Sequence, residues 1–245
     1  MRTLLVDCRA PERYAAGHVP GAVHADPERD LTLPGQDPAT GGRHPLPSPL
    51  QLDEVLAGLG VDDDTFVLAC DEGEGWAARC WWLLRHVGHD AAGTLDLRRY
   101  AGPLEQAAGR QTPRGEVSRG GATRRVTAPR SDDTITAEEI YARLGDPSLV
   151  LLDARAPERW RGEVEPLDPV AGRIPGARNA CFEHPLPTDL PDDAELAVYC
   201  GSGVTACVVV HELVLAGHER VRMYPGSFSE WCRREGYPIE RSQPQ

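Results

Sequence analysis

An internal repeat constrains the fold of this 245-residue chain more than any other feature. Residues 7–14 (DCRAPERY) return as residues 153–160 (DARAPERW), and residues 17–22 (GHVPGA) return as residues 172–177 (GRIPGA). A unit of about a hundred residues is large enough to form a domain, whereas solenoid repeats span only about 20–50 residues. The sequence therefore predicts two similar domains.

Each copy alternates short apolar runs, typical of buried strands, with stretches typical of helices. The expected strands lie at residues 4–6, 66–69, 149–152 and 196–199, and the expected helices include residues 76–87 and 206–215. This alternation predicts an α/β fold of two domains, each with a mainly parallel sheet and helices on both faces. Ligands of such sheets bind at the C-terminal ends of the strands.

Polar, aperiodic stretches indicate where the domains and loops begin and end. Residues 109–133 are predicted to be a linker between a domain at residues 1–108 and a domain at residues 134–245. Residues 26–49 hold many Pro, Gly and Asp residues and are predicted to be a long loop. Residues 136–139 (TAEE) have the pattern of a capping box, which predicts the start of a helix.

Cys200 has the sequence context that is most informative about function. It follows the expected strand at residues 196–199, and residues 200–206 (CGSGVTA) lead into the apolar helix at residues 206–215. Small residues allow a tight turn with its backbone N–H groups directed inward. The start of the helix adds a partial positive charge. Both effects favour thiolate over thiol, so Cys200 is expected to be a nucleophile in a cradle that can hold an anion.

Three interpretations of this cysteine compete. The simplest is an inert, buried cysteine on a tight turn between strand and helix. A cysteine phosphatase would need an arginine six residues further on to bind phosphate, but that position is Ala206. In sulfur transfer, the third interpretation, the thiolate takes a sulfane sulfur and becomes a persulfide.

Residues 200–206 resemble the active loop of the rhodanese superfamily of sulfurtransferases. The Gly-Ser pair after the cysteine is similar to the mercaptopyruvate branch, whereas the thiosulfate branch more often has basic residues there. The resemblance implies two rhodanese-like domains and transfer of sulfur from a small anionic donor to a thiol, cyanide or a thioredoxin-like acceptor. It favours 3-mercaptopyruvate as the donor, with thiosulfate:cyanide transfer or a non-enzymatic sulfur carrier or binding module as alternatives. We expect no cofactor, and the scattered cysteines and histidines indicate no metal site.

The resemblance extends to the first copy of the repeat. Alignment of the Gly-His pairs at residues 88–89 and 217–218 places Asp71 opposite Cys200. The loop after Asp71 is acidic and would repel an anion. Tandem rhodaneses similarly have an inactive first domain, often with aspartate at this position. The resemblance therefore implies an inactive N-terminal domain and a catalytic C-terminal domain.

Further site residues are implied by the resemblance. Arg159 matches an arginine associated with the carboxylate or sulfonate of the donor, and its guanidinium offers two parallel donors to a planar anion. Arg155 is expected to hold the turn, and His18 is a minor candidate for a proton relay with the loop serine. The other expected substrate-binding residues belong to the loop: Gly201, Ser202, Gly203, Val204 and Thr205.

Two of these loop residues have a second interpretation. Ser202 is expected either to donate its hydroxyl to the donor or to form the turn, and Thr205 is expected to cap the following helix. The chain also departs from the family pattern at two positions. Leu167 follows Glu165-Pro166 where the mercaptopyruvate branch usually has a second substrate arginine, and Arg173 stands where histidine is usual.

Composition excludes several classes of partner. The net charge of −12 disfavours nucleic acid. The seven cysteines show no Cys-x-x-Cys pair and no zinc spacing, which suits a reducing compartment. No stretch approaches about 18 consecutive apolar residues, and the N-terminus lacks the pattern of a signal peptide. We therefore expect a cytoplasmic protein that has no membrane partner.

Overall fold

The computed structural model describes residues 1–106, 129–191 and 193–242. The chain divides into two compact units, one of Met1–Leu33 with Pro47–Arg130 and one of Pro34–Leu46 with Ser131–Gln245. Most of the predicted linker, residues 109–128, lies outside the described residues. The short segment Pro34–Leu46 thus packs with the second unit, although its sequence lies among residues of the first.

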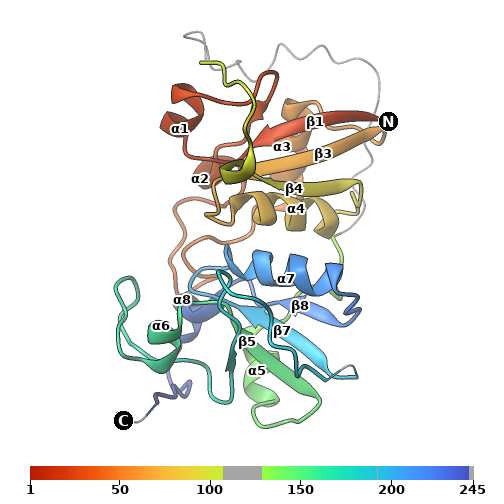
Figure 1. The fold of residues 1–245 in the computed structure, drawn as a ribbon. Helices are drawn as coiled ribbons and strands as arrows, with labels where there is room; N and C mark the ends of the chain where they lie inside the picture. Colours follow the sequence, from red (N-terminus) through yellow and green to blue (C-terminus); the bar gives the residue numbers. More distant parts are fainter. Residues whose placement is uncertain (107–128, 192, 243–245) are drawn as a thin grey trace. The chain divides into compact units, whose positions relative to one another are not determined.

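The first unit contains a parallel sheet with the strand order β2-β1-β3-β4 (Figure 1). Its strands are β1 (Arg2–Asp7), β2 (Val23–His24), β3 (Thr65–Asp71) and β4 (Ala92–Asp96). Its helices are α1 (Pro11–Ala16), α2 (Pro27–Asp30), α3 (Pro49–Leu59), α4 (Trp76–His86) and the 3-10 turn η1 (Leu97–Arg99). Helix α4 packs on β3 and β4, and its buried residues include Trp81 and Leu84.

The second unit repeats this topology with the strand order β6-β5-β7-β8, again parallel throughout. Its strands are β5 (Leu149–Asp153), β6 (Arg178–Asn179), β7 (Glu195–Tyr199) and β8 (Val221–Met223). Its helices are α5 (Ala137–Ala142), α6 (Pro157–Arg161), α7 (Ala206–Leu215) and α8 (Ser227–Trp231). The two sheets confirm the predicted α/β fold of two similar domains.

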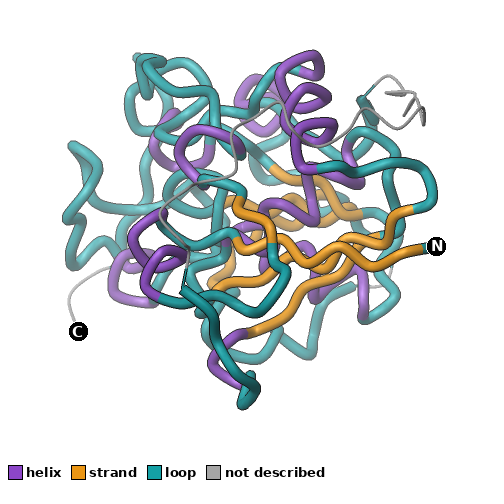
Figure 2. The backbone as a smooth tube through the Cα atoms, turned by 90° about the horizontal axis from the view of Figure 1, so that it is seen from above, coloured by secondary structure: helices purple, strands orange, loops and turns teal. Residues whose placement is uncertain are grey.

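Local predictions are confirmed in part. The capping box is present, because Thr136 Oγ1 accepts from Glu139 N at 3.2 Å and Glu139 Oε2 accepts from Thr136 N at 2.9 Å. The predicted loop at residues 26–49 is interrupted by α2, which begins with Pro27 after the capping residue Asp26. A proline at the first helical position suits a helix start, because its fixed φ is already helical. Loops still connect many of the elements, as the trace in Figure 2 shows.

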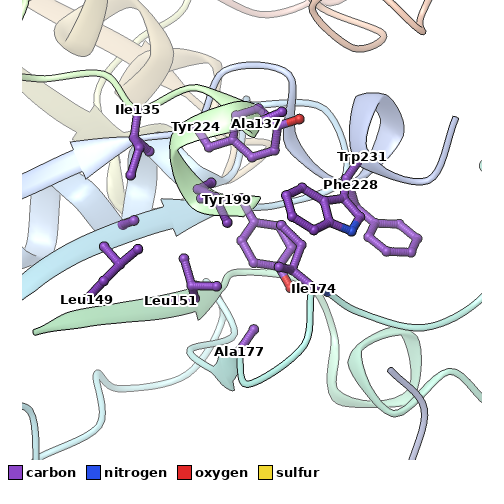
Figure 3. Packing of buried hydrophobic residues seen from close by; sticks show 12 residues of the cluster. Ile135, Ala137, Leu149, Leu151, Ile174, Ala177, Tyr199, Tyr224, Phe228 and Trp231 are labelled. Atoms are coloured by element: carbon purple, nitrogen blue, oxygen red, sulfur yellow. Dashed lines mark hydrogen bonds between the residues drawn. The ribbon is translucent and has the colours of Figure 1, made fainter. Parts of the chain in front are cut away.

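The core of the second unit gathers buried side chains from several elements (Figure 3). Leu149 and Leu151 from β5 lie near Tyr199 from β7, and Phe228 and Trp231 from α8 complete the cluster. Tyr199 is fully buried, and its hydroxyl accepts a hydrogen bond from Ile174 N at 3.1 Å. Burial, together with the nearby Asp153 carboxylate, raises the pKa of Tyr199 well above its usual value, so the hydroxyl stays neutral. The last residue of β7 is therefore firmly held.

No helix in the described ranges is long and apolar enough to cross a lipid bilayer.

Candidate active site

Cys200 lies at the C-terminal end of β7, between the ends of the neighbouring strands β5 and β8. Its Sγ accepts hydrogen bonds from Ser202 N at 3.4 Å and from Gly203 N at 3.1 Å. Gly203 has a φ of +83°, a conformation that a residue with a side chain adopts only under strain. The tight turn expected from the small residues thus directs two backbone donors at the sulfur, which stabilises a negative charge there.

The loop leads directly into α7, whose bounds agree with the predicted helix. Thr205 stands at the N-cap position, but its side chain makes no capping hydrogen bond, so that part of the prediction is wrong. The physical reason is that the first turn is tight. Cys207 N donates to Val204 O at 3.0 Å and Val208 N donates to Thr205 O at 3.1 Å, so these amides already have acceptors.

Residues at the start of α8 also hold the loop in place through hydrogen bonds. Cys200 N donates to Ser227 Oγ at 3.1 Å, and Ser227 Oγ donates to Tyr224 O at 3.0 Å. Phe228 N and Ser229 N donate to the carbonyls of Cys200 and Gly201, both at 3.0 Å. Sequence reasoning missed Ser227, which has a left-handed φ of 53°. The sequence gives little sign of it, since a serine rarely adopts that conformation.

Arg155 is buried and holds the turn after β5. It pairs with Asp153 at 2.6 Å and with Glu165 at 3.2 Å, and its Nη2 donates to Gly172 O at 2.7 Å. Burial alone would lower the pKa of Arg155, but the Asp153 and Glu165 carboxylates outweigh burial and raise it. The guanidinium of Arg155 is thus bound by carboxylates and a carbonyl of the protein itself.

Arg159 approaches the loop that carries Cys200. Its Nη2 is 2.6 Å from Glu165 Oε1 and 3.8 Å from Asp168 Oδ2, and its side chain is 17% exposed. A Cβ built on Gly201 would lie 3.3 Å from Arg159 Nη2. The guanidinium therefore stands directly over the residue that follows Cys200.

Two residues of the site were missed by sequence reasoning, because they belong to the segment Pro34–Leu46 of the predicted loop. His44 Nδ1 lies 2.8 Å from Ser202 Oγ. Arg43 pairs with the buried Asp168, and its Nη2 would lie 3.0 Å from a Cβ on Gly201. Both residues lie in a Pro- and Gly-rich stretch, and the sequence there does not indicate that this stretch packs with the second unit.

His18 occupies a different environment. Its Nδ1 lies 3.1 Å from Tyr14 O, its ring stacks on Tyr14 with centroids 3.9 Å apart, and its Nε2 is 3.4 Å from Glu105. All these partners belong to the first unit. The histidine that contacts the loop serine is His44.

Comparison with known proteins agrees with the geometry. The rhodanese-like domain family matches this chain twice, over residues 1–102 and 136–234. The chain belongs to the tandem rhodanese-domain sulfurtransferases. It is 42% identical to a probable 3-mercaptopyruvate sulfurtransferase of Pseudomonas aeruginosa, over 96% of this chain and 91% of that protein. It is 33% identical to a thiosulfate sulfurtransferase of the same organism, over 97% of this chain and 90% of the relative.

A solved structure supports the fold of this sulfurtransferase. The Tum1 protein from Saccharomyces cerevisiae superimposes with a TM-score of 0.79, at 19% identity, over 99% of this chain and 93% of that one. The chain thus has the architecture of a protein with two rhodanese-like domains along nearly its whole length.

The first rhodanese domain carries an aspartate where the second has its cysteine. Asp71 accepts hydrogen bonds from Gly73 N at 3.0 Å, Gly75 N at 2.8 Å and Ala77 N at 3.0 Å. A carboxylate of the protein therefore takes up the backbone donors of this loop. The neighbouring Glu72 pairs with Arg9 at 2.8 Å and with Arg13. At the loop position that corresponds to Cys200, the described part of the first rhodanese domain thus has a carboxylate whose oxygens already accept the backbone N–H groups.

In the described parts of both rhodanese domains, no group of three or more His, Cys, Asp or Glu side chains is arranged to hold a metal ion.

Proposed function

We propose that this sulfurtransferase takes sulfur from 3-mercaptopyruvate and passes it to a thiophilic acceptor through a persulfide on Cys200. The observation that carries the choice of donor is the 2.8 Å contact between His44 Nδ1 and Ser202 Oγ, next to the catalytic loop. A proton-carrying pair at this place suits a donor whose leaving group must be protonated.

The first half-reaction breaks the carbon–sulfur bond of the donor. The Cys200 thiolate attacks the donor sulfur, a sulfur–sulfur bond forms, and the electron pair of the broken bond stays on the organic fragment as the enolate of pyruvate. The enolate takes a proton to become pyruvate. His44 acting through Ser202 supplies that proton, a role for which imidazole is well suited near neutral pH. Sulfite, the leaving group from thiosulfate, would need no such proton.

The second half-reaction regenerates the enzyme. An acceptor thiolate or cyanide attacks the outer sulfur of the persulfide, and the Cys200 thiolate leaves. In the resting enzyme, Ser202 N and Gly203 N both donate to Cys200 Sγ. We propose that they, with the rest of the loop from Gly201 to Thr205, hold the persulfide between the two steps. A covalent intermediate predicts ping-pong kinetics.

Further observations support this proposal. Cys200 is only 1% exposed, which suits a small donor. The relative at 42% identity is named for 3-mercaptopyruvate. None of the seven cysteines, all within the described ranges, forms a disulfide, which suits a reducing cytoplasm with a thiol or thioredoxin-like acceptor. Thiosulfate is the second candidate donor, because the arginines near Gly201 also suit a sulfonate and a relative at 33% identity is named for it.

Steady-state kinetics with each donor test the proposal. We expect a higher kcat/KM with 3-mercaptopyruvate than with thiosulfate, and loss of both activities in Cys200→Ser. A higher kcat/KM with thiosulfate would overturn the choice of donor. Absence of turnover with both donors, in a protein that still forms a persulfide when given inorganic polysulfide as a source of sulfane sulfur, would indicate a sulfur carrier.

A further inference from the structure

The segment that follows helix α8 returns across the second domain and pairs with Arg173. The backbone N–H groups of Arg173 and Glu240 each donate to the carbonyl of the other residue at 2.9 Å. The Glu240 carboxylate also forms an ion pair with Arg173 and accepts a hydrogen bond from Gly176 N at 2.8 Å. Residues 239–242, which we call the strap, are therefore fastened to one of the two Pro-Gly turns that the sequence repeats.

The first domain has the same closure. His18 and Glu105 exchange backbone hydrogen bonds at 2.9 and 2.8 Å, and Glu105 Oε1 accepts from Gly21 N at 2.9 Å. The Nε2 of His18 lies 3.4 Å from that carboxylate oxygen. The two segments also share a short pattern, Pro-Leu-Glu at residues 103–105 and Pro-Ile-Glu at residues 238–240. The closure belongs to the repeat, and the two copies differ in the residue that faces the glutamate.

Arg173 extends the closure of the second domain to helix α6. Its guanidinium stacks on the ring of Trp160, with Cζ 4.2 Å from the ring centroid. Its Nη1 donates to Trp160 O at 3.1 Å and to Ser242 Oγ at 3.0 Å, and its side chain is only 8% exposed. Arginine keeps its charge at physiological pH, whereas histidine titrates near it. Arg173 therefore joins the strap to α6 through a permanent charge.

The strap holds the end of α6 that lies next to Arg159. Ser242 N donates to Arg161 O at 3.0 Å, and Arg173 donates to Trp160 O. These two carbonyls belong to the residues that directly follow Arg159, the arginine that is expected from the sequence to bind the anionic group of the donor. A movement of this helix end would therefore move the guanidinium of Arg159 relative to the catalytic loop.

A second set of contacts connects the strap with the same arginine. A Cβ built on Gly172 would lie 2.6 Å from a strap carbonyl and would also clash with Ile239, so only glycine lets the strap approach this closely. The carbonyl of Gly172 accepts from Arg155 Nη2 at 2.7 Å. Arg155 and Arg159 both pair with Glu165, at 3.2 and 2.6 Å. The strap thus supports both the backbone and the side-chain partner of Arg159.

We infer that Arg173 and Glu240 are positioning residues for sulfur transfer, because they fasten the strap to α6 and thereby hold Arg159 where the donor binds. The inference rests on the proposed function and on the role expected for Arg159. It gives a reason for the arginine at position 173, where the family usually has histidine. The first domain, whose aligned loop residue is Asp71, has His18 in the corresponding closure.

Kinetics of Arg173 variants test this assignment. We expect Arg173→Gln to raise KM for the donor about 3- to 10-fold, because a displaced Arg159 makes a weaker charge-assisted hydrogen bond. The kcat should change by no more than about twofold, since that bond is made in both ground and transition states. Arg173→Lys keeps the charge beside Glu240 but not the planar fork, so its KM should be intermediate. Arg178→Gln is the matched control, because Arg178 pairs with Asp189, which is 78% exposed.

Hydrogen exchange measured by NMR tests the link to α6 without turnover. At the end of this helix, Gly162 N donates to Arg159 O at 3.1 Å. We expect this amide to exchange about 10-fold faster or more in Arg173→Gln, because loss of a charge-assisted bond favours local opening. The amides of residues 202–203 should keep their wild-type rates. Glu240 is 40% exposed, so Glu240→Gln removes the ion pair with less risk to folding and should change KM and exchange in the same directions.

The outcomes separate this inference from the proposed function. An unchanged exchange rate at Gly162 in folded Arg173→Gln overturns the hold of the strap on α6. Faster exchange with an unchanged KM shows a merely structural role and overturns the positioning of Arg159. If wild type forms no persulfide with either donor, the proposed function fails, and the exchange rates still decide whether the strap holds α6.

Discussion

His44 Nδ1 lies 2.8 Å from Ser202 Oγ, although the two residues are 158 positions apart in the sequence. Ser202 also donates its backbone N–H to Cys200 Sγ at 3.4 Å. One residue therefore links the Cys200 sulfur with a group that can carry a proton. Under the proposed function, we expect this link to distinguish donors whose leaving group needs a proton from those whose leaving group does not.

Replacement of His44 tests the link directly. We expect His44→Asn to lower kcat with 3-mercaptopyruvate about 100-fold or more, because general acid catalysis commonly contributes factors of about 10²–10⁴. Turnover with thiosulfate should fall by less than about fivefold, since sulfite leaves without protonation. His18→Asn is the matched control, because His18 contacts Tyr14 and Glu105. Equal losses with both donors would show that His44 only supports the structure of the loop.

Ser227 is expected to position Cys200 through the backbone. Its Oγ accepts from Cys200 N at 3.1 Å, and Ser227→Ala leaves this buried amide without an acceptor. We expect the free energy of unfolding to fall by about 1–3 kcal/mol. Ser227→Gly loses the same hydrogen bond but relieves the left-handed φ of 53°, so it should be the more stable of the two variants. Urea unfolding of both variants measures the difference, and the reverse order would contradict this role.

Asp71 is expected to stabilise the first domain rather than to take part in catalysis. Its carboxylate accepts three backbone N–H groups, so Asp71→Ala should lower the free energy of unfolding by about 2 kcal/mol or more. Asp71→Cys should not create a second reactive site, because Glu72 still pairs with Arg9 and Arg13. In a Cys200→Ser background, mass spectrometry should find no persulfide on residue 71. A persulfide there would show that the first domain lacks only its nucleophile.

Asp168 is expected to contribute to the dependence of stability on pH. Burial alone would raise the pKa of Asp168, but hydrogen bonds from Arg43 and Arg233 outweigh burial and hold it below its usual value. A carboxylate with a lowered pKa in the folded state stabilises the fold above the unfolded value of about 3.9. This contribution is lost as the pH falls through the lower, folded-state pKa.

Asp168→Asn should therefore unfold more easily at neutral pH and should lose less stability between about pH 5 and pH 2 than wild type does. Urea unfolding over this range provides the comparison. Asp189→Asn is a suitable control, because Asp189 is 78% exposed and its pair with Arg178 should contribute less than about 1 kcal/mol. Parallel pH profiles for wild type and Asp168→Asn would contradict the assignment.

The fold could be predicted from sequence because its signals are local or repeated. The duplicated segments indicated two similar domains, and continuous apolar runs marked the strand that ends at Asp71 and the strand that ends just before Cys200. Helix α7 was placed correctly because its residues are apolar almost throughout, from Ala206 to Leu215. The capping box at Thr136 is likewise a pattern of neighbouring residues.

The site was only partly predictable, because it also depends on residues brought together by tertiary packing. Cys200 and Arg159 belong to recognisable motifs of the second domain. Arg43 and His44 lie in a stretch without periodicity, and only folding brings them to Asp168 and Ser202. The prediction that Thr205 caps α7 rested on the general preference for threonine at helix starts. It was wrong because backbone carbonyls in the tight first turn of α7 already accept the N–H groups that the side chain would have bound.

Mass spectrometry after incubation with 3-mercaptopyruvate, in the absence of an acceptor, tests the central claim most directly. Tryptic cleavage gives one peptide of residues 179–220 that holds Cys181, Cys200 and Cys207, so fragmentation must locate the modification. We predict the added mass of one sulfur atom on Cys200, its removal by cyanide, and its absence in Cys200→Ser. No added sulfur, or sulfur on Cys181 or Cys207 instead, would contradict the account.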